Sequence, residues 1–198
     1  WISSVDKISE VDRTETAVLS DLKNRIAEAG WGRAFLKRQQ PEGHWGRAFY
    51  QPKWTSSHYT LVDLRNLCIP ATPEIKKALA LILATSIGPD GGINPSKDIE
   101  QSDVCINGMF LNYGCYFGTD EEKLRSVVDF IVSQQLADGG FNCRLNRSGA
   151  RHSSMHSTIS VLEGIREYIA AGYAFRAEEL KRIEGEAQEF LLRHRLFK

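Results

Sequence analysis

The stretch QPEGHWG at residues 40–46 returns twice in altered form, as GPDGGIN at residues 88–94 and as LADGGFN at residues 136–142. The glycines Gly43, Gly91 and Gly139 of the three copies follow one another at intervals of 48 residues. In each copy an acidic residue precedes this glycine, and a large apolar residue stands two positions after it. Such a unit suits a helix that ends at a glycine with positive φ, followed by an apolar side chain that folds back onto the core. A fixed period of this length predicts a protein built from repeated structural units.

Apolar residues at helical spacing lie on both sides of these loops. Leu79 and Ile82 belong to one such pattern before the second loop, and Leu124, Val127 and Ile131 belong to another before the third. Second helices are predicted after the loops, over roughly residues 56–67, 103–115 and 154–170, and a further helix over residues 14–29. We therefore predict an all-α fold of helical hairpins in a single domain over residues 1–198. Its repeats cover roughly residues 30–70, 73–117 and 120–172, with a fourth beginning near residue 177.

The composition indicates a globular domain and excludes some partners. Hydrophobic residues make up 42% of the 198 residues and charged residues 25%, which is ordinary for a domain with an apolar core. The formal net charge is zero, with Lys and Arg interspersed among Asp and Glu, so no basic stripe is present and nucleic acid is not an expected partner. The most apolar stretch, residues 78–84, is too short to cross a bilayer, so we expect no membrane span.

The four cysteines, Cys68, Cys105, Cys115 and Cys143, contain no CxxC pair and lack the density of a small secreted protein. Residues 1–20 carry acidic side chains where a signal peptide would carry a charged and then apolar pattern. We therefore expect reduced thiols in a cytoplasmic protein. Cys115 and Cys143 have no base next to them in the sequence and are interpreted as packing residues.

Residues 32–45 (GRAFLKRQQPEGHW) read as an aromatic and an aliphatic residue, three residues, Gln, a short spacer and Gly-x-Trp. This pattern resembles the Gln-Trp repeat motif of the squalene cyclase and protein prenyltransferase superfamily. The third copy repeats it with Gln135 and Phe141 after a spacer longer by one, whereas the middle copy has no such Gln and carries Ile93 in the aromatic position. A Gln at a helix end suits hydrogen bonds to free backbone groups, and the aromatic residue suits closure of the hairpin. These roles are structural and name no reaction.

The resemblance implies an α/α toroid, a ring of six helical hairpins. This chain holds about 3.5 of them, so we expect an incomplete toroid: either part of a longer ring, or a half-ring that covers its inner face by forming an oligomer. Protein prenyltransferases also work with a separate helical subunit. A partner subunit or a homo-oligomer is therefore expected.

In toroids of this family the second helix of each hairpin lines the cavity, and its first residues lie at the mouth. Asp103 and Cys105 begin the second of these helices, and His156 begins the third. This arrangement resembles the zinc site of protein prenyltransferase β-subunits, and a carboxylate, a thiolate and an imidazole leave one position open for substrate. Asp103 and Cys105 reach one ion only if Asp103 caps the helix, because residues two apart do not share a helix face. The alternative is a cap, a buried thiol and a satisfied pocket histidine.

Two departures weaken this comparison, since Glu100 stands where the family has a base and Ile106 where it has Tyr. Lys97 matches a diphosphate-binding position of the family. The acids at residues 120–122 suit either a magnesium-diphosphate motif or the first turn of a helix.

Other residues are candidate ligand contacts. Trp54, His58 and Tyr59 surround the start of the helix expected at residues 56–67, where they suit a ligand floor or a hydrogen-bonded helix entry. Arg144 and Arg151 suit a diphosphate contact or plain solvation of the third loop. His152 stands four residues before His156, a spacing that chelates metal on a continuous helix, although Ser153 and Ser154 predict a helix cap between them.

We expect a prenyltransferase- or terpene cyclase-like protein that binds an isoprenoid or other apolar ligand in the toroid cavity. Zinc-dependent transfer of a prenyl group to a thiol is the chemistry that the resemblance implies. The alternative is a non-catalytic helical-repeat module that binds a peptide or a protein partner on its concave face. A carbohydrate-active ring would need paired acids at one mouth, where only Asp103 and Glu100 are placed.

Overall fold

The computed structural model describes residues 17–96, 100–143 and 149–194, and all the regular structure in these ranges is helical except for one isolated bridge between Ile87 and Ile93. This confirms the all-α prediction for the described part of the chain. A helix occupies residues 17–28, from the point where the description begins. The others are α2 (Gly30–Leu36), α3 (Ser57–Asn66), α4 (Pro73–Thr85), α5 (Val104–Tyr116), α6 (Glu121–Ser133), α8 (Met155–Ala170) and α9 (Ala177–Arg193).

The helices α3, α5 and α8 each begin one residue later than predicted, because the residue expected to open the helix is its N-cap. Ser56, Asp103 and Ser154 occupy these cap positions with extended backbone. The Ser154 Oγ accepts a hydrogen bond from the Ser157 N–H at 3.3 Å, which satisfies one of the donors that a helix start leaves free. The start of α4 likewise has Pro73 in its first turn after the cap residue Thr72.

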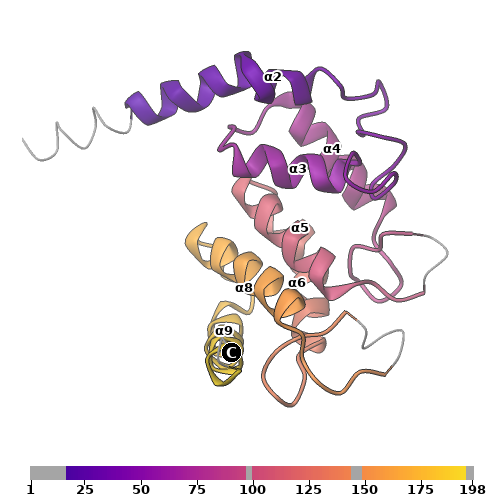
Figure 1. The fold of residues 1–198 in the computed structure, drawn as a ribbon, viewed down its shortest axis with the longest axis vertical. Helices are drawn as coiled ribbons and strands as arrows, with labels where there is room; N and C mark the ends of the chain where they lie inside the picture. The colour runs from indigo at the N-terminus through magenta and orange to yellow at the C-terminus, as the bar shows by residue number, and fades with distance from the viewer. Residues whose placement is uncertain (1–16, 97–99, 144–148, 195–198) are drawn as a thin grey trace, which may run out of the picture.

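The helices α3, α5 and α8 follow one another through the molecule, with α5 packed against both of the others (Figure 1). The helix α6 packs on α5, and α9 packs on α8. At the α5–α8 crossing two backbones meet, because a Cβ on Gly164 would lie 2.4 Å from the Gly108 carbonyl oxygen. A Cβ on Gly108 would lie 2.5 Å from the Ser160 carbonyl oxygen. This crossing therefore requires glycine on both helices.

One apolar core joins all of these helices. Its largest fully buried side chains include Tyr113 on α5, Tyr168 on α8 and Phe141 in the third loop. The outer helices contribute stripes at helical spacing, which are Ile75, Ala78, Leu79 and Ile82 on α4, Leu124, Val127, Val128 and Ile131 on α6, and Leu180, Ile183 and Ala187 on α9.

The glycine loops have the predicted backbone conformation. Gly43, Gly91 and Gly139 have φ values of +109°, +82° and +94°, which a side chain would strain. The predicted role of the glutamine needs a correction in the first copy. The spacing of the motif assigns this role to Gln40, but the hydrogen bond to the loop glycine comes from Gln39. The Gln39 Nε2 donates to the Gly43 carbonyl at 3.0 Å, as the Gln135 Nε2 does to the Gly139 carbonyl at 3.1 Å. The 48-residue period, rather than the spacing of the motif, gives the equivalent residue.

The apolar residue after each loop glycine is buried, with at most 2% of its surface exposed, and its backbone N–H donates to a side chain of the following helix. This bond repeats in all three copies, so each loop is fastened to the first or second turn of its helix. The pairs are Trp45 N to Ser57 Oγ (3.0 Å), Ile93 N to Asn107 Oδ1 (2.6 Å) and Phe141 N to Thr158 Oγ1 (3.0 Å).

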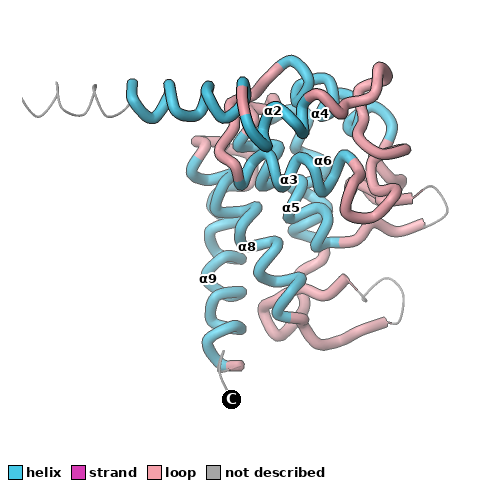
Figure 2. Tube along the Cα trace, turned by 45° about the horizontal axis from the view of Figure 1, so that its top comes forward, coloured by secondary structure: helices cyan, strands magenta, loops and turns pink. Residues whose placement is uncertain are grey.

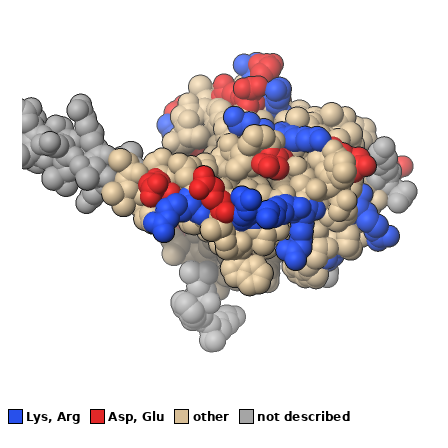
Figure 3. Space-filling model, turned by 90° about the horizontal axis from the view of Figure 1, so that it is seen from above, with Lys and Arg blue, Asp and Glu red and all other residues tan. Residues whose placement is uncertain are grey.

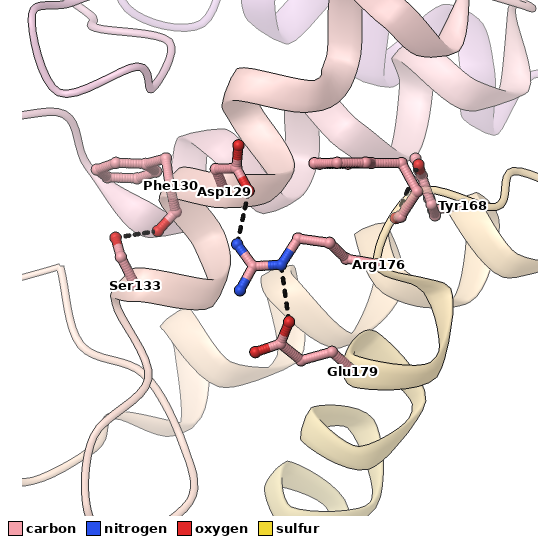
Figure 4. A network of polar contacts seen from close by, with 7 residues as sticks. Asp129, Phe130, Ser133, Tyr168, Arg176 and Glu179 are labelled. Carbon is pink, nitrogen blue, oxygen red and sulfur yellow. Dashed lines mark hydrogen bonds and ion pairs between the residues drawn. The ribbon is translucent and has the colours of Figure 1, made fainter.

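Polar contacts hold the last helices together. Arg176, the N-cap of α9, places its guanidinium between Asp129 of α6 and Glu179 of α9, with N–O distances of 2.6 and 2.7 Å (Figure 4). Glu121 Oε1 accepts hydrogen bonds from the Tyr168 hydroxyl at 2.9 Å and the Phe175 N–H at 2.8 Å. Asp120 is the N-cap residue of α6 and Glu121 and Glu122 lie in its first turn, which is the position that the helix-terminus interpretation of these acids expects.

The surface combines both charge signs with one apolar projection. Lys and Arg lie beside Asp and Glu on the face seen in Figure 3. The helix at residues 17–28 stands away from the other helices (Figures 1 and 2) and exposes Val18, Leu19 and Leu22 by 53%, 58% and 45%. None of the helices within the described ranges has the length and apolar character needed to cross a membrane.

Candidate functional site

The starts of α3, α5 and α8 and the loops that lead into them lie on one side of the molecule (Figures 1 and 2). The loop acids fasten two of these helix starts. Asp90 accepts hydrogen bonds from the Ser102 N–H at 2.6 Å and the Ser102 hydroxyl at 2.8 Å. Asp138 accepts the Ser153 N–H at 2.8 Å and also the Ser153 hydroxyl. The residues that begin α5 and α8 are therefore held in place by the repeat itself.

Two thiols meet between the starts of α5 and α8. The Cys143 Sγ accepts the backbone N–H of Cys105 at 3.2 Å and the hydroxyl of Ser157 at 3.2 Å. The Cys143 N–H in turn donates to the Ser157 Oγ at 3.1 Å, so both the backbone and the side chain of Cys143 are fixed to α8. The thiol of Cys105 is close enough to that of Cys143 for each to shift the pKa of the other. Both cysteines are half-buried.

This hydrogen bonding divides the two thiols chemically. Donors from Cys105 and Ser157 stabilise the Cys143 thiolate and lower the pKa of Cys143 from 9.0 to about 7. The pKa of Cys105 is raised, first because its proton is engaged by Cys143 and then because the thiol is buried. The pair therefore favours a state in which Cys143 is the thiolate and Cys105 keeps its proton. A thiolate, and not a thiol, is the nucleophile and the metal ligand.

A cluster of aromatic rings lies beside the start of α3. The His58 side chain is fully buried against Phe49, Tyr50 and Tyr113, with ring centroids 5.5, 5.4 and 5.9 Å away. Its Nδ1 lies 3.3 Å from the Tyr113 hydroxyl, while its Nε2 is buried with no hydrogen-bond partner. Burial lowers the pKa of His58 from 6.5 to about 3, so this imidazole is neutral at physiological pH.

Tyr50 connects the aromatic cluster with the thiol pair. Its hydroxyl lies 2.8 Å from the Tyr59 hydroxyl. Burial raises the pKa of Tyr50, and the hydrogen bond to Tyr59 and the nearby carboxylate of Asp103 raise it further. The aromatic rings, the carboxylate of Asp103 and the thiols therefore form one neighbourhood at the starts of α3 and α5.

The structure brings together part of the zinc set implied by the resemblance. Asp103 occupies the N-cap position of α5, as the zinc hypothesis requires, without a capping hydrogen bond from its side chain, and its charge acts on both Cys105 and Cys143. His156 lies in the first turn of α8 with an exposed side chain, and its carbonyl accepts the Ser160 hydroxyl at 3.0 Å. Within residues 17–96, 100–143 and 149–194, no three His, Cys, Asp or Glu side chains gather closely enough to hold a metal ion. Zinc binding therefore stays a prediction.

The remaining candidates lie in different places. Trp54 is 69% exposed with a φ of +77°, and its ring lies 4.8 Å from that of Tyr59. Arg151 and His152 are exposed before α8, and Ser154 caps that helix after His152, so the two histidines do not share a continuous helix. Lys97 and Arg144 lie outside the described residues.

Sequence reasoning missed the role of Cys143. The packing interpretation is incomplete, because this thiol packs against the core and also receives hydrogen bonds at its sulfur from the Cys105 N–H and the Ser157 hydroxyl. Cys105 is 38 residues away along the chain, and only the packing of α5 against α8 brings the two together. The position of Cys143 in the repeat could have indicated this role. Cys143 follows the buried Phe141 by two residues, so both residues lie on the side of the loop that faces the start of the next helix.

A cavity lies between α3, α5 and α8, and neither Cys105 nor Cys143 is among its lining residues. Cys105, Met109, Asn112 and Tyr116 form one stripe along α5 at helical spacing, and all four are half-buried. Met109 and Asn112 line this cavity, which has a volume of 500 Å³. An ion pair between Arg65 of α3 and Glu167 of α8, with an N–O distance of 2.7 Å, lies at this cavity. The other lining residues are Val62, Asn66, Ser160, Glu163, Arg166 and Ala170.

A second cavity of 630 Å³ lies between the first and second loops, where His44, Phe49, Ile82 and Ile87 line it. None of the cysteines lines this cavity either. Comparison of the chain with protein family models, curated proteins and solved structures found no match. The function therefore has to be argued from the residues of the site.

Proposed function

We propose that this chain is a prenyltransferase- or terpene cyclase-like protein that binds an isoprenoid or other apolar ligand between α3, α5 and α8 and reacts at the thiol pair. The observation that carries the proposal is the stripe on α5, because Cys105 stands one turn before Met109 on the same helix face. In this proposal a ligand in the cavity extends past Met109 toward Cys105 and Cys143. In this proposal the helices α3, α5 and α8 are the inner helices of an incomplete α/α toroid of about 3.5 hairpins.

The chain supplies two elements of such chemistry. The first is a nucleophile, since the Cys143 thiolate is held by the N–H of Cys105 and the hydroxyl of Ser157. The second is the partial positive charge of the N-terminal ends of α5 and α8, which meet at this point and offset part of the negative charge of Asp103. A prenyl diphosphate places an apolar chain and an anionic leaving group next to each other. The cavity and the helix ends match these two parts.

We retain zinc as a proposed cofactor. The thiols of Cys105 and Cys143, the carboxylate of Asp103 and the imidazole of His156 are donors that zinc accepts, and bound zinc would lower the pKa of an incoming thiol. Metal analysis of the purified full chain tests this part. Stoichiometric zinc that is lost in Cys105→Ala supports it, whereas the absence of stoichiometric zinc, or zinc retained in the double variant Cys105→Ala/His156→Ala, removes Asp103, Cys105 and His156 as the zinc site.

Titration of the full chain with farnesyl diphosphate, followed by isothermal calorimetry, tests ligand binding in the cavity. Met109→Lys places a charge on the cavity wall and is expected to weaken binding at least tenfold, since the ligand would meet a buried ammonium group. Leu192→Lys makes the same change at a side chain on α9 that is 67% exposed, and this control is expected to bind as wild type does. Absence of binding to wild type, or equal loss in both variants, would contradict the proposal.

A second function is favoured by the charges at the other end of the cavity. Arg65, Glu163, Arg166 and Glu167 line the same cavity, and such a polar wall suits the backbone and side chains of a peptide. A non-catalytic helical-repeat module would bind its partner there. Salt separates a charged peptide from an uncharged isoprenoid, because affinity for the peptide falls as salt is added, while contacts between an uncharged apolar chain and Met109 are not screened.

A further inference from the structure

We propose that Cys105 and Cys143 form a reversible intramolecular disulfide, which makes the adjoining starts of α5 and α8 a site of thiol–disulfide exchange with low-molecular-weight disulfides. The proposal stands on the placement of the two cysteines and does not depend on the ligand proposed above. Cys143 Sγ lies 3.2 Å from the backbone nitrogen of Cys105, so the side chain of Cys143 reaches the residue that carries the second thiol. The two thiols also shift each other's pKa, as neighbouring groups do.

The scaffold holds both cysteines at this separation. Cys143 is fastened to α8 through its own N–H and the Ser157 hydroxyl at 3.1 Å, and Phe141 is fastened through the Thr158 hydroxyl at 3.0 Å. Cys105 belongs to α5, which meets α8 at the Gly108–Gly164 crossing. Little conformational freedom remains to be lost when the sulfurs bond, so the intramolecular reaction has a high effective concentration.

The other two cysteines differ from this pair in their surroundings. Cys68 is exposed, and its thiol is hydrogen-bonded to the carbonyl of Asn66 at 3.9 Å. Cys115 is 3% exposed in the core. Cys105 and Cys143 combine partial exposure with a partner thiol, and both conditions are needed for exchange with a small disulfide.

The exchange has two steps. The Cys143 thiolate attacks one sulfur of the small disulfide, which forms a mixed disulfide and releases one small thiolate that takes up a proton. Cys105 then gives up its proton and attacks the Cys143 sulfur, which forms the Cys105–Cys143 bond and releases the second small thiolate. The protein loses two electrons and two protons, and the small disulfide is reduced to two thiols. The reverse reaction with excess small thiol restores both cysteines.

The test uses the full chain, reduced and then incubated with excess oxidised glutathione in the presence of a metal chelator. Remaining thiols are alkylated after denaturation and counted by mass spectrometry. Of the four thiols, two are expected to disappear with no increase in chain size, and peptide fragmentation is expected to join Cys105 to Cys143. Excess reduced glutathione is expected to return all four.

Variants separate the two steps. Cys105→Ser is expected to stop at a mixed disulfide between Cys143 and glutathione, and Cys143→Ser is expected to form no intramolecular disulfide. The matched control Cys68→Ser removes a thiol outside the site and is expected to oxidise as wild type does. The peptide map of the oxidised wild type shows whether Cys105 is joined to Cys143 even if a variant fails to fold. Four thiols that remain free, or disulfides that involve Cys68 or only join separate chains, would overturn the proposal.

Discussion

The first and third copies of the repeat share one scaffold and differ in the chemistry that it presents. In both, a glycine with positive φ accepts a glutamine hydrogen bond at its carbonyl, and an aromatic residue two positions later is buried. In both, the backbone N–H of that aromatic residue donates to a hydroxyl in the next helix, at 3.0 Å in each case. The first copy then leads to the buried imidazole of His58. The third leads to the thiolate of Cys143.

This difference shows where the repeat permits variation. The glutamine, the glycine and the aromatic residue complete the hairpin, so these three positions have structural roles and leave little room for variation. The residues that follow the aromatic residue and those that open the next helix differ between the copies. Burial keeps His58 neutral, whereas hydrogen bonds lower the pKa of Cys143 to about 7. One scaffold therefore carries a neutral imidazole in the first copy and a thiol of lowered pKa in the third.

The largest expected effect comes from removing the shared aromatic residue. Trp45→Ala and Phe141→Ala each leave a cavity in the core, and each is expected to lower the free energy of unfolding by about 3–5 kcal/mol. Trp45 also loses its indole bond to the Phe35 carbonyl, which is 2.8 Å long. Urea unfolding followed by circular dichroism measures both. A loss below about 1 kcal/mol in either variant would break the equivalence of the two copies.

A smaller effect follows from the pKa of His58. Its folded-state pKa of about 3 lies below the unfolded value of 6.5, so the unfolded chain takes up a proton first as the pH falls. Stability is therefore complete above pH 6.5 and is lost between pH 6.5 and 3, by about 2 kcal/mol at pH 5. We expect His58→Gln, which keeps a polar group near Tyr113, to lack this part of the pH dependence. Urea unfolding at pH 5 and pH 7.5 measures it, and identical pH dependence in both proteins would contradict the burial argument.

The smallest effect compares two glycines that share a backbone conformation. Gly43→Ala and Gly139→Ala both strain a positive φ at about 1–2 kcal/mol. The new Cβ at Gly43 meets the flexible Lys77 side chain at 2.9 Å, whereas at Gly139 it meets the Glu186 backbone carbonyl at 2.9 Å. We expect Gly139→Ala to cost about 1 kcal/mol more, because the backbone of α9 cannot move aside as a lysine can. Equal unfolding midpoints would show that the third loop is no tighter than the first.

Most of the fold was predictable from the sequence, because the repeat supplies several independent signals. Cap residues such as Ser154 and Asp103 located the helix starts to within one residue, and the acid–glycine pairs located the loops. The middle copy lacks both the glutamine and the aromatic residue, yet Ile93 is fully buried and is held by Asn107. The 48-residue period therefore identified equivalent positions in the three copies better than residue identity did. The same period identifies Gln39, rather than Gln40, as the partner of Gly43.

The site was less predictable, because its contacts join residues that are distant along the chain. Asp103 and Cys105 were selected from a local pattern, and the cap geometry at Asp103 is confirmed. The partner of the Cys105 thiol proved to be Cys143, since the α5–α8 crossing brings the two together. The pKa of Cys143 depends on where the Ser157 hydroxyl points, and no spacing rule encodes that direction.

The most direct test of the reactive thiolate in the third copy is the alkylation rate of each cysteine in the reduced full chain, measured by mass spectrometry between pH 5.5 and 9.5. The account predicts that Cys143 reacts with iodoacetamide at a rate that is half-maximal near pH 7, because its thiolate accepts hydrogen bonds from Cys105 and Ser157. In Ser157→Ala the midpoint is expected to move to higher pH. A wild-type Cys143 whose rate rises only near pH 9, or that reacts more slowly than Cys68 at every pH, would contradict the account.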